Sequence, residues 1–433
     1  MIEYTTHMLP LFASPLKYLL KTSFFKDATL LVVLQIVSQT NNFIATYFVA
    51  RFLGPANMGL ISFTQTYIVF TFFINSGLDS YYMWQLANSR ENKSSIFSRC
   101  FTTRIFINTI SLVIGLFGVY FFSNSFFEAL ILTCSLFIGF FVYSIGFSSS
   151  FLLTEKRVKE YVIIAILTSF TIFALRAIFV YIEAPVYYFI FTLLSETLII
   201  VGYGSLLHIL HLRSIYFLKK EWIKKSIQEF FSAISHIGTV LSSLIFSRVD
   251  QFFIKANLSP HDLGLYTSSV RLVEYPMIIS SLLTTLIIPR ISASNEPKHR
   301  TRIAIFSTTL YIVIALSIVV VYLVWSNQIV KFVYGQSFME AVPIFSIYTL
   351  IIPGLWLHNS MSIILAAYNK MHISFILCSV AGLLSILFLS NLITHFGVYG
   401  AAYSAVFIQN SLGIASFFTV LYFHLKTRLH NNT

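Results

Sequence analysis

The sequence FVARFLGPANMGLIS occupies positions 48–62, and a related sequence, FIKANLSPHDLGLYT, occupies positions 253–267. Pro55 aligns with Pro260 and Gly59 with Gly264 without a gap, over an offset of 205 positions. Each copy follows the end of an apolar block of the chain. Internal duplication of this kind is typical of transporters, which place a binding site near the midplane between two like halves.

The composition is that of a membrane protein. Of the 433 residues, 57% are hydrophobic and 10% are charged, whereas a soluble domain has roughly 25% charged residues. The three cysteines lie in apolar blocks, which indicates small core residues and neither disulfides nor metal ligands. No cleavable signal peptide is apparent, so we expect the first helix to act as its own insertion signal.

Apolar stretches of about 20 residues, the length that crosses a bilayer, recur along the chain and predict an all-α polytopic protein of about twelve spans. The expected ranges are 28–50, 57–79, 101–123, 127–152, 160–182, 186–209, 229–255, 262–288, 303–326, 341–366, 373–394 and 400–424. We expect Pro276, among other prolines, to kink its helix.

The longest polar segment predicts a division into two lobes. Residues 1–210 and 229–433 each hold six expected spans, and the basic linker 211–228 lies between them. With the N-terminus inside, 22 of the 28 lysines and arginines fall on the cytoplasmic side and three on the other. This asymmetry follows the positive-inside rule and predicts that both termini are cytoplasmic. The net charge of +12 is therefore explained by topology and does not indicate nucleic-acid binding.

Ionisable residues inside the expected spans are the main candidates for a site. Arg248 and Asp250 lie in the seventh span, and Arg271 and Glu274 lie three residues apart on one face of the eighth. A charge at the bilayer centre costs about 2.5–3.5 kcal/mol, so it usually faces a cavity or a partner. Two interpretations remain: ion pairs that fix helix packing, or a cationic cavity lining that binds phosphate bidentately.

The first half offers further candidates. Arg51 and Arg176 could add to a cationic cavity, or Arg51 could extend its charge to the membrane surface. Glu196 is a candidate structural partner of Arg176, and Asp250 and Glu274 are candidates for ion coupling or pairing. A polar stripe recurs at helical spacing in the first span and predicts either a cavity wall or interhelical hydrogen bonds. Its members are Gln35, Ser38, Gln39 and Asn42.

Catalytic motifs are absent from the sequence. There is no HExxH, GxSxG or P-loop pattern, and no expected outer connection is long enough for a catalytic domain. We therefore expect no enzyme activity, no cofactor, no metal and no ATP-driven step on this chain.

Six short segments follow one another along the chain: Arg51–Gly59, Asn75–Gly77, Arg248–Gln251, Gly264–Tyr266, Arg271–Glu274 and Phe396–Ala402. In their order and spacing they resemble bacterial polysaccharide flippases of the Wzx type, which belong to the multidrug/oligosaccharidyl-lipid/polysaccharide exporter superfamily. The first half departs from the family pattern, since Tyr81-Tyr82-Met83 stands where basic residues are often found.

The resemblance implies two parallel six-helix repeats around a central cavity. It implies a substrate of undecaprenyl-pyrophosphate-linked oligosaccharide units, for O-antigen or a similar surface polysaccharide, moved to the periplasmic leaflet of the bacterial inner membrane. Arg248, Arg271, Arg51 and Arg176 would then neutralise the diphosphate. Membrane lipids, a polysaccharide polymerase and a chain-length regulator are the implied partners.

Three alternatives remain open at this stage. The first is a cation or drug antiporter of the same superfamily, which would favour acidic groups in the cavity. The second is a membrane enzyme of glycan assembly. The third is a flippase for lipid-linked peptidoglycan precursors, which normally has more helices than the twelve expected here.

Overall fold

The computed structural model describes residues 23–88, 93–147, 157–212, 220–293, 297–368 and 370–430, and in these ranges the chain is almost entirely helical, without strands. Nine of the described helices are each long and apolar enough to cross a membrane, and the bent pair α3 (Ser23–Thr71) and α4 (Ile74–Asn88) brings the total to ten. All twelve expected ranges overlap helices. The expectation of an all-α polytopic membrane protein is confirmed.

The first two expected spans meet within α3. The chain turns at Gly54, whose φ of 73° and ψ of 177° are accessible to glycine at little cost. The second span then continues with a 53° bend into α4. The other first-half helices are α5 (Lys93–Phe122), α6 (Phe126–Ile145), α8 (Val158–Tyr181) and α9 (Val186–Leu212).

Several second-half spans are divided into shorter helices. The eighth expected span is interrupted at Pro276. Proline lacks the N–H that would bond the carbonyl of Leu272, and the Tyr322 hydroxyl donates to that carbonyl instead at 3.0 Å. The helices are α10 (Lys220–Ser232), α11 (Ile234–Asn257), α12 (Pro260–Glu274), α13 (Met277–Ala293), α14 (Pro297–Val324), α15 (Ser326–Tyr334), α16 (Ala341–Thr349), α17 (Ile352–Ala367), α18 (Met371–Phe396) and α19 (Val398–His430), with a 3₁₀ turn at Gln336–Phe338.

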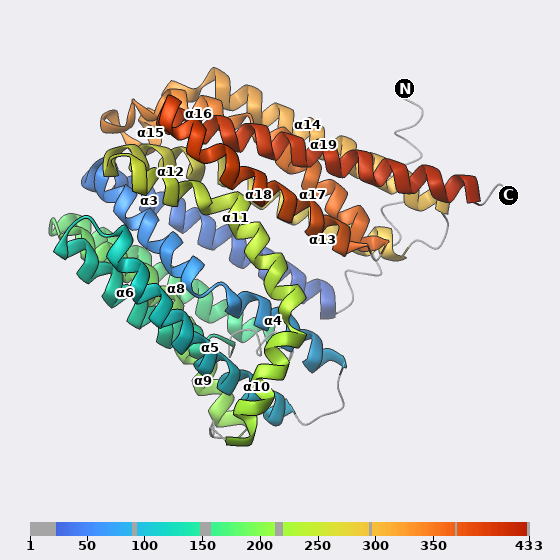
Figure 1. The fold of residues 1–433 in the computed structure, drawn as a ribbon, viewed down its shortest axis with the longest axis horizontal. Coiled ribbons are helices and arrows are strands. Elements are labelled where there is room, and N and C mark those ends of the chain that lie inside the picture. Colours follow the sequence, from blue (N-terminus) through green and yellow to red (C-terminus); the bar gives the residue numbers. More distant parts are fainter. Residues whose placement is uncertain are drawn as a thin grey trace.

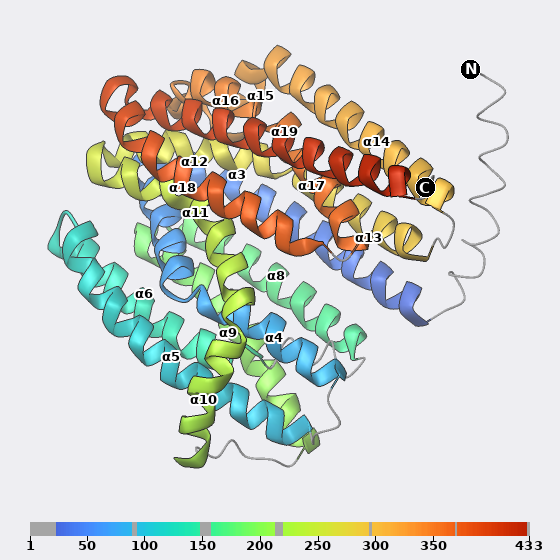
Figure 2. The same cartoon turned by 45° about the vertical axis from the view of Figure 1, so that its right-hand side comes forward.

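Helices α5, α6, α8 and α9 lie on one side of the molecule, and α14, α16 and α19 lie on the opposite side (Figure 1). Helices α3 and α11 lie between these groups, and the groups diverge toward the ends of α10 and α19 in both views (Figure 2). The predicted linker 211–228 includes the last residues of α9, seven residues outside the described part and most of α10. The exact boundaries of the two lobes stay a prediction.

The two copies of the repeated sequence pack directly against each other. A Cβ on Gly59 would lie 2.6 Å from the Pro260 carbonyl oxygen, and one on Gly264 would overlap the backbone of Pro55. Helices α3 and α12 therefore touch through their backbones where each carries a glycine. We call this region, with the α3 turn and the α11–α12 connection, the Gly54 end.

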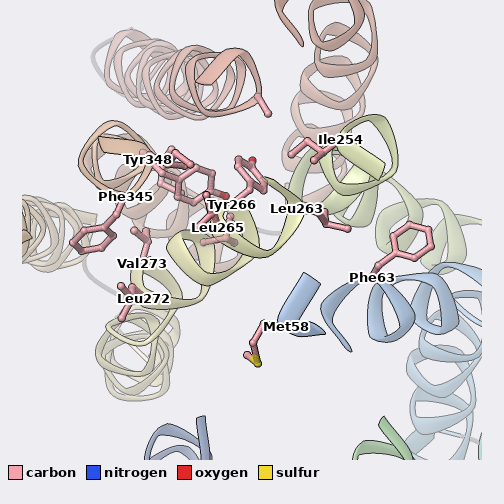
Figure 3. Packing of buried hydrophobic residues seen from close by; sticks show 14 of the residues in the cluster. Met58, Phe63, Ile254, Leu263, Leu265, Tyr266, Leu272, Val273, Phe345 and Tyr348 are labelled. Carbon is pink, nitrogen blue, oxygen red and sulfur yellow. The ribbon is translucent and has the colours of Figure 1, made fainter. Parts of the chain in front are cut away.

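A large apolar core surrounds this contact. Met58 and Phe63 of α3, Leu263 of α12 and Ile254 of α11 all belong to this core, and their side chains are almost fully buried (Figure 3). Beyond α12 the core continues to α16, where the rings of Tyr266 and Tyr348 meet edge to face at 5.7 Å. The core thus holds helices of both halves together at the Gly54 end.

Replacing Gly264 with alanine tests the backbone contact. Because the new Cβ overlaps Pro55, we expect Gly264→Ala to lower the free energy of unfolding by about 1–3 kcal/mol, the usual cost of overpacking. Chemical unfolding of the purified protein in detergent measures this change. Gly202→Ala is the control, since nothing lies within 4 Å of its added Cβ; a Gly264→Ala protein as stable as this control would contradict the prediction.

Candidate functional site

A cavity of about 500 Å³ lies between α3, the helices α8 and α9, and the helices α11 and α12. Arg248 lies nine residues before the end of α11, and Arg271 lies eleven residues after the start of α12. At about 1.5 Å per residue both are roughly 14–17 Å from the Gly54 end, which is mid-depth in a hydrocarbon core of about 30 Å. The cavity is therefore inside the membrane.

Three arginines line this cavity: Arg176 from α8, Arg248 from α11 and Arg271 from α12. Arg248 forms an ion pair with Glu274, with 2.6 Å between Nη2 and Oε1. Glu274 therefore neutralises the positive charge of Arg248. Arg248 and Glu274 thus form the ion pair of the first interpretation and also line the cavity, while phosphate binding by Arg248 stays a prediction.

Arg176 is held by neutral groups. Its Nε donates to Thr192 Oγ1 at 3.1 Å and its Nη1 donates to Asn42 Oδ1 at 3.2 Å. Its Nη2 is buried and has no hydrogen-bond partner, and the residue as a whole is 8% exposed. The expected ion pair with Glu196 does not form, because these neutral partners fix the guanidinium.

The side chain of Arg271 makes neither an ion pair nor a hydrogen bond with any residue that the structure describes. It lines the cavity together with Arg176, and Glu274 is the one acidic residue among the lining residues. Three cations against one anion leave an excess of positive charge in a membrane-embedded space. Such a space favours an anionic ligand, since an unpaired charge in the membrane is costly.

Arg51 lies outside the cavity. Its Nη2 donates to the carbonyl oxygens of Lys331 and Phe332 in α15, at 3.2 and 2.6 Å, and its guanidinium carbon lies 4.1 Å from the centre of the Tyr47 ring. The site predicted from the sequence therefore contains Arg176, Arg248 and Arg271 in one place, but not Arg51.

Asp250 also lies outside the cavity lining. It is buried, accepts a hydrogen bond from the Tyr266 hydroxyl, and accepts the backbone N–H of Gln251 at 2.8 Å. Asp250 is therefore paired across helices with an uncharged partner, a tyrosine of α12. Glu196 lines a smaller, adjoining cavity.

The polar stripe of α3 serves partly as a cavity wall and partly for interhelical hydrogen bonding, the two alternatives predicted for it. Gln39 and Asn42 line the central cavity, and Ser38 lines the adjoining one. Gln35 instead donates a hydrogen bond to Ser281 of α13 at 2.9 Å.

Several lining residues were missed by the sequence reasoning. Gln65 and Thr66 lie on the part of α3 that follows the turn, and the Thr66 hydroxyl donates to Gln251 Oε1 of α11 at 2.7 Å. The sequence did contain a signal for these residues, because Gln65 and Thr66 are adjacent polar residues inside an apolar span. The remaining polar residues of the lining are Thr46, Ser62, Ser247, Thr267 and Tyr275.

A buried ion pair joins the two halves beside the Gly54 end. Lys255 of α11 pairs with Glu128 in the first turn of α6, and their side chains are 4% and 9% exposed. The Lys255 ammonium also lies 5.5 Å from the centre of the Phe63 ring. Lys255 is the last residue of the expected span 229–255 and lies in the last turn of α11, where Glu128 neutralises its charge across the interface.

The comparisons with known proteins agree with this architecture. The model of a family described as polysaccharide biosynthesis protein matches residues 24–295, which is more than half of the chain. No curated protein matches.

Solved transporter structures share the fold. A structure of the lipid II flippase MurJ in an inward closed conformation superposes with a TM-score of 0.70 at 15% identity, covering 90% of this chain and 86% of that one. An inward-facing multidrug resistance MATE family transporter of the MOP superfamily gives 0.69 at 13% identity, covering 92% and 99%. A MOP superfamily transporter from Pyrococcus furiosus, described as having a binding pocket of reverse polarity, gives 0.58 at 14% identity, covering 94% and 97%.

The buried ion pair between the halves yields a stability prediction. Lys255→Met leaves Glu128 as an unpaired buried charge, so we expect a loss of about 3–5 kcal/mol, most of which the double variant Lys255→Met/Glu128→Leu should recover. Unfolding in detergent measures both variants.

The control for this experiment is Arg157→Met. Arg157 pairs with Glu160 on the surface of α8, with side chains 22% and 42% exposed, and exposed pairs contribute about 0–1 kcal/mol. Equal losses from Lys255→Met and Arg157→Met would show that the buried pair does not hold the halves together.

Proposed function

Because this chain belongs to the polysaccharide biosynthesis protein family, we propose that it is a flippase that moves a lipid-linked anionic glycan across the membrane. The observation that carries the proposal is the excess of guanidinium groups in the central cavity. Arg271 has no partner among the described residues, and Arg176 has a buried Nη2 without one. Arg271 is available to a ligand at mid-membrane depth, and Arg176 lines the same cavity.

A diphosphate is the ligand chemistry that fits these groups best. Guanidinium is planar, stays charged and presents paired N–H donors that match phosphate oxygens bidentately. Arg176 and Arg271 come from different halves of the chain, so a diphosphate held between them would connect both halves. A single carboxylate among three arginines disfavours the alternative of a cation antiporter.

Movement between leaflets is the activity that fits this fold. The cavity lies between two sets of helices that carry the repeated sequence, and rocking of such halves around a fixed site produces alternating access. Backbone contact at Gly59 and Gly264 and the pair Lys255–Glu128 join the halves near the Gly54 end. A substrate would enter from the opposite end, where the helices diverge.

We propose, more specifically, an undecaprenyl-pyrophosphate-linked oligosaccharide repeat unit as the substrate, for O-antigen or a related surface polysaccharide. Its polyprenyl tail stays in the lipid while the diphosphate and sugars occupy the cavity. The charge asymmetry of the connections supports a bacterial inner membrane protein with both termini in the cytoplasm. The direction of movement is then from the cytoplasmic to the periplasmic leaflet.

Arg271 is the residue on which to test this function. Loss of one charged hydrogen-bonding partner costs about 1.5–3 kcal/mol, so we expect Arg271→Ala to weaken binding of undecaprenyl diphosphate roughly 10- to 100-fold and to reduce surface polysaccharide in cells that depend on this protein. Arg271→Lys, which keeps the charge without the paired donors, should be intermediate.

Binding to the purified protein and the amount of surface polymer are measured together with the membrane level of each variant. Arg157→Ala, which removes an arginine on the surface of α8, serves as the matched control. If Arg271→Ala reaches the membrane normally and retains both binding and polymer at the level of Arg157→Ala, the cationic cavity is not the substrate site.

A further inference from the structure

A groove of about 540 Å³ lies in the second half of the chain, between α14, α17 and α19. Helices α14 and α19 both pack against α17, which forms the floor between them. Both lie on the side of the molecule away from α5 and α6 (Figures 1 and 2). Among the described residues, none lines both this groove and the central cavity. The groove is therefore a separate space, away from the three cavity arginines.

The walls of the groove are mainly apolar. Ile305 and Ile312 come from α14, Ile364 comes from α17, and Phe417 and Leu421 come from α19. Ile305 is 63% exposed, so the groove opens toward the surrounding bilayer. Such walls take up a hydrocarbon chain and exclude water, because burial of apolar surface is favourable.

The groove starts at one membrane surface and ends near the middle of the membrane. Thr301 and Phe423 are terminal residues of two membrane spans, and Lys370 directly precedes a third. Along α14 the lining reaches from Thr301 to Ile312, which is about 16 Å at 1.5 Å per residue. That length is roughly half of a hydrocarbon core of about 30 Å, so the groove matches the acyl chain of a lipid in one leaflet.

The opening of the groove is positively charged. Lys370 lines it, and its Nζ lies 3.6 Å from the centre of the Phe423 ring. An adjoining hollow shares Thr301 and Ile305 with the groove and also includes Arg302. Neither basic side chain forms an ion pair within the described ranges. The N-terminus of α14 adds a partial positive charge from its unpaired backbone N–H groups.

The sequence around this opening is basic as well. Glu296 is the one acidic residue in the stretches 296–302, 368–372 and 424–430. The positive-inside rule predicts that this surface faces the cytoplasm, where anionic lipids create a negative surface potential. The lysines and arginines of these stretches are Lys298, Arg300, Arg302, Lys370, Lys426 and Arg428.

We propose that the groove between α14, α17 and α19 binds an anionic phospholipid of the predicted cytoplasmic leaflet, as a structural ligand and not as cargo. One acyl chain lies along the apolar walls, and the phosphate accepts hydrogen bonds from Lys370 and Arg302. Basic pockets between membrane helices bind acidic headgroups in this way. The bound chain fills the space between α14 and α19 and so stabilises their packing on α17.

A polyprenyl diphosphate also combines an apolar tail with an anionic head. In the proposed function, however, its diphosphate lies at the cavity arginines, and the groove shares no described lining residue with that cavity. The groove is therefore assigned to membrane phospholipid, and this assignment does not depend on the transported substrate.

Binding of phosphatidylglycerol and of phosphatidylcholine to the purified protein in detergent, measured by native mass spectrometry, tests the headgroup site. We expect the wild-type protein to prefer phosphatidylglycerol. Lys370→Gln and Arg302→Gln should each weaken its binding about fivefold, the effect of one basic residue near an anionic surface, and leave phosphatidylcholine binding unchanged. Lys159→Gln, which changes an exposed lysine at the start of α8, is the matched control.

Thr309→Trp tests the apolar part of the site. Thr309 is an exposed residue of the α14 wall, and an indole there would occupy the space of the acyl chain, so binding of both phospholipids should fall. Thermal unfolding of each variant without added lipid confirms that the protein is intact. Arg302→Gln, at an exposed position, decides the test if Lys370→Gln does not fold.

Three results would overturn the proposal. The first is equal binding of the two phospholipids by the wild-type protein, or phosphatidylglycerol binding by Lys370→Gln and Arg302→Gln at the level of Lys159→Gln. The second is unchanged binding by Thr309→Trp. The third is displacement of phosphatidylglycerol by undecaprenyl phosphate at equal concentration, which would assign the groove to the polyprenyl lipid. The proposed function is tested separately by the Arg271 variants.

Discussion

A guanidinium inside a bilayer must be paired, hydrated or bound by a ligand, and the central structure of this protein follows from that constraint. Arg248 is paired with Glu274, Arg176 is partly satisfied by Thr192 and Asn42, and Arg271 has no protein partner among the described residues. The remaining positive charge is tolerable only where water or an anion reaches it. A polar cavity at this depth is therefore the condition under which these helices are stable in a membrane.

The repeated sequence supplies the frame that holds this cavity. Each copy contributes one glycine to a backbone contact between α3 and α12, and large apolar side chains pack around it. The tight contact leaves no space at the Gly54 end, so the free volume lies deeper, beside the arginines. Duplication thus explains both the packing of the two halves and the place of the site.

The sequence predicted the features that depend on local pattern. Hydropathy predicted the spans, and the charged residues inside those spans included Arg248 and Arg271, which line the cavity. It could not predict the partner of Arg51, since α15 approaches Tyr47 only in the folded chain. Glu128 and Lys255 are 127 positions apart, and nothing in the local sequence around either residue indicates that they form a pair. The missed Gln65 shows that polar residues inside spans warrant the same weight as charged ones.

The break at Pro276 has a mechanical consequence. Proline donates no hydrogen bond at this point, and the carbonyl of Leu272 is already bound to the Tyr322 hydroxyl of α14. Flexing here costs the backbone one hydrogen bond less than flexing an intact helix would. The interruption lies just beyond Glu274, at the end of α12. Helix α13 can therefore tilt relative to α12 while Arg271 and Glu274 keep their positions.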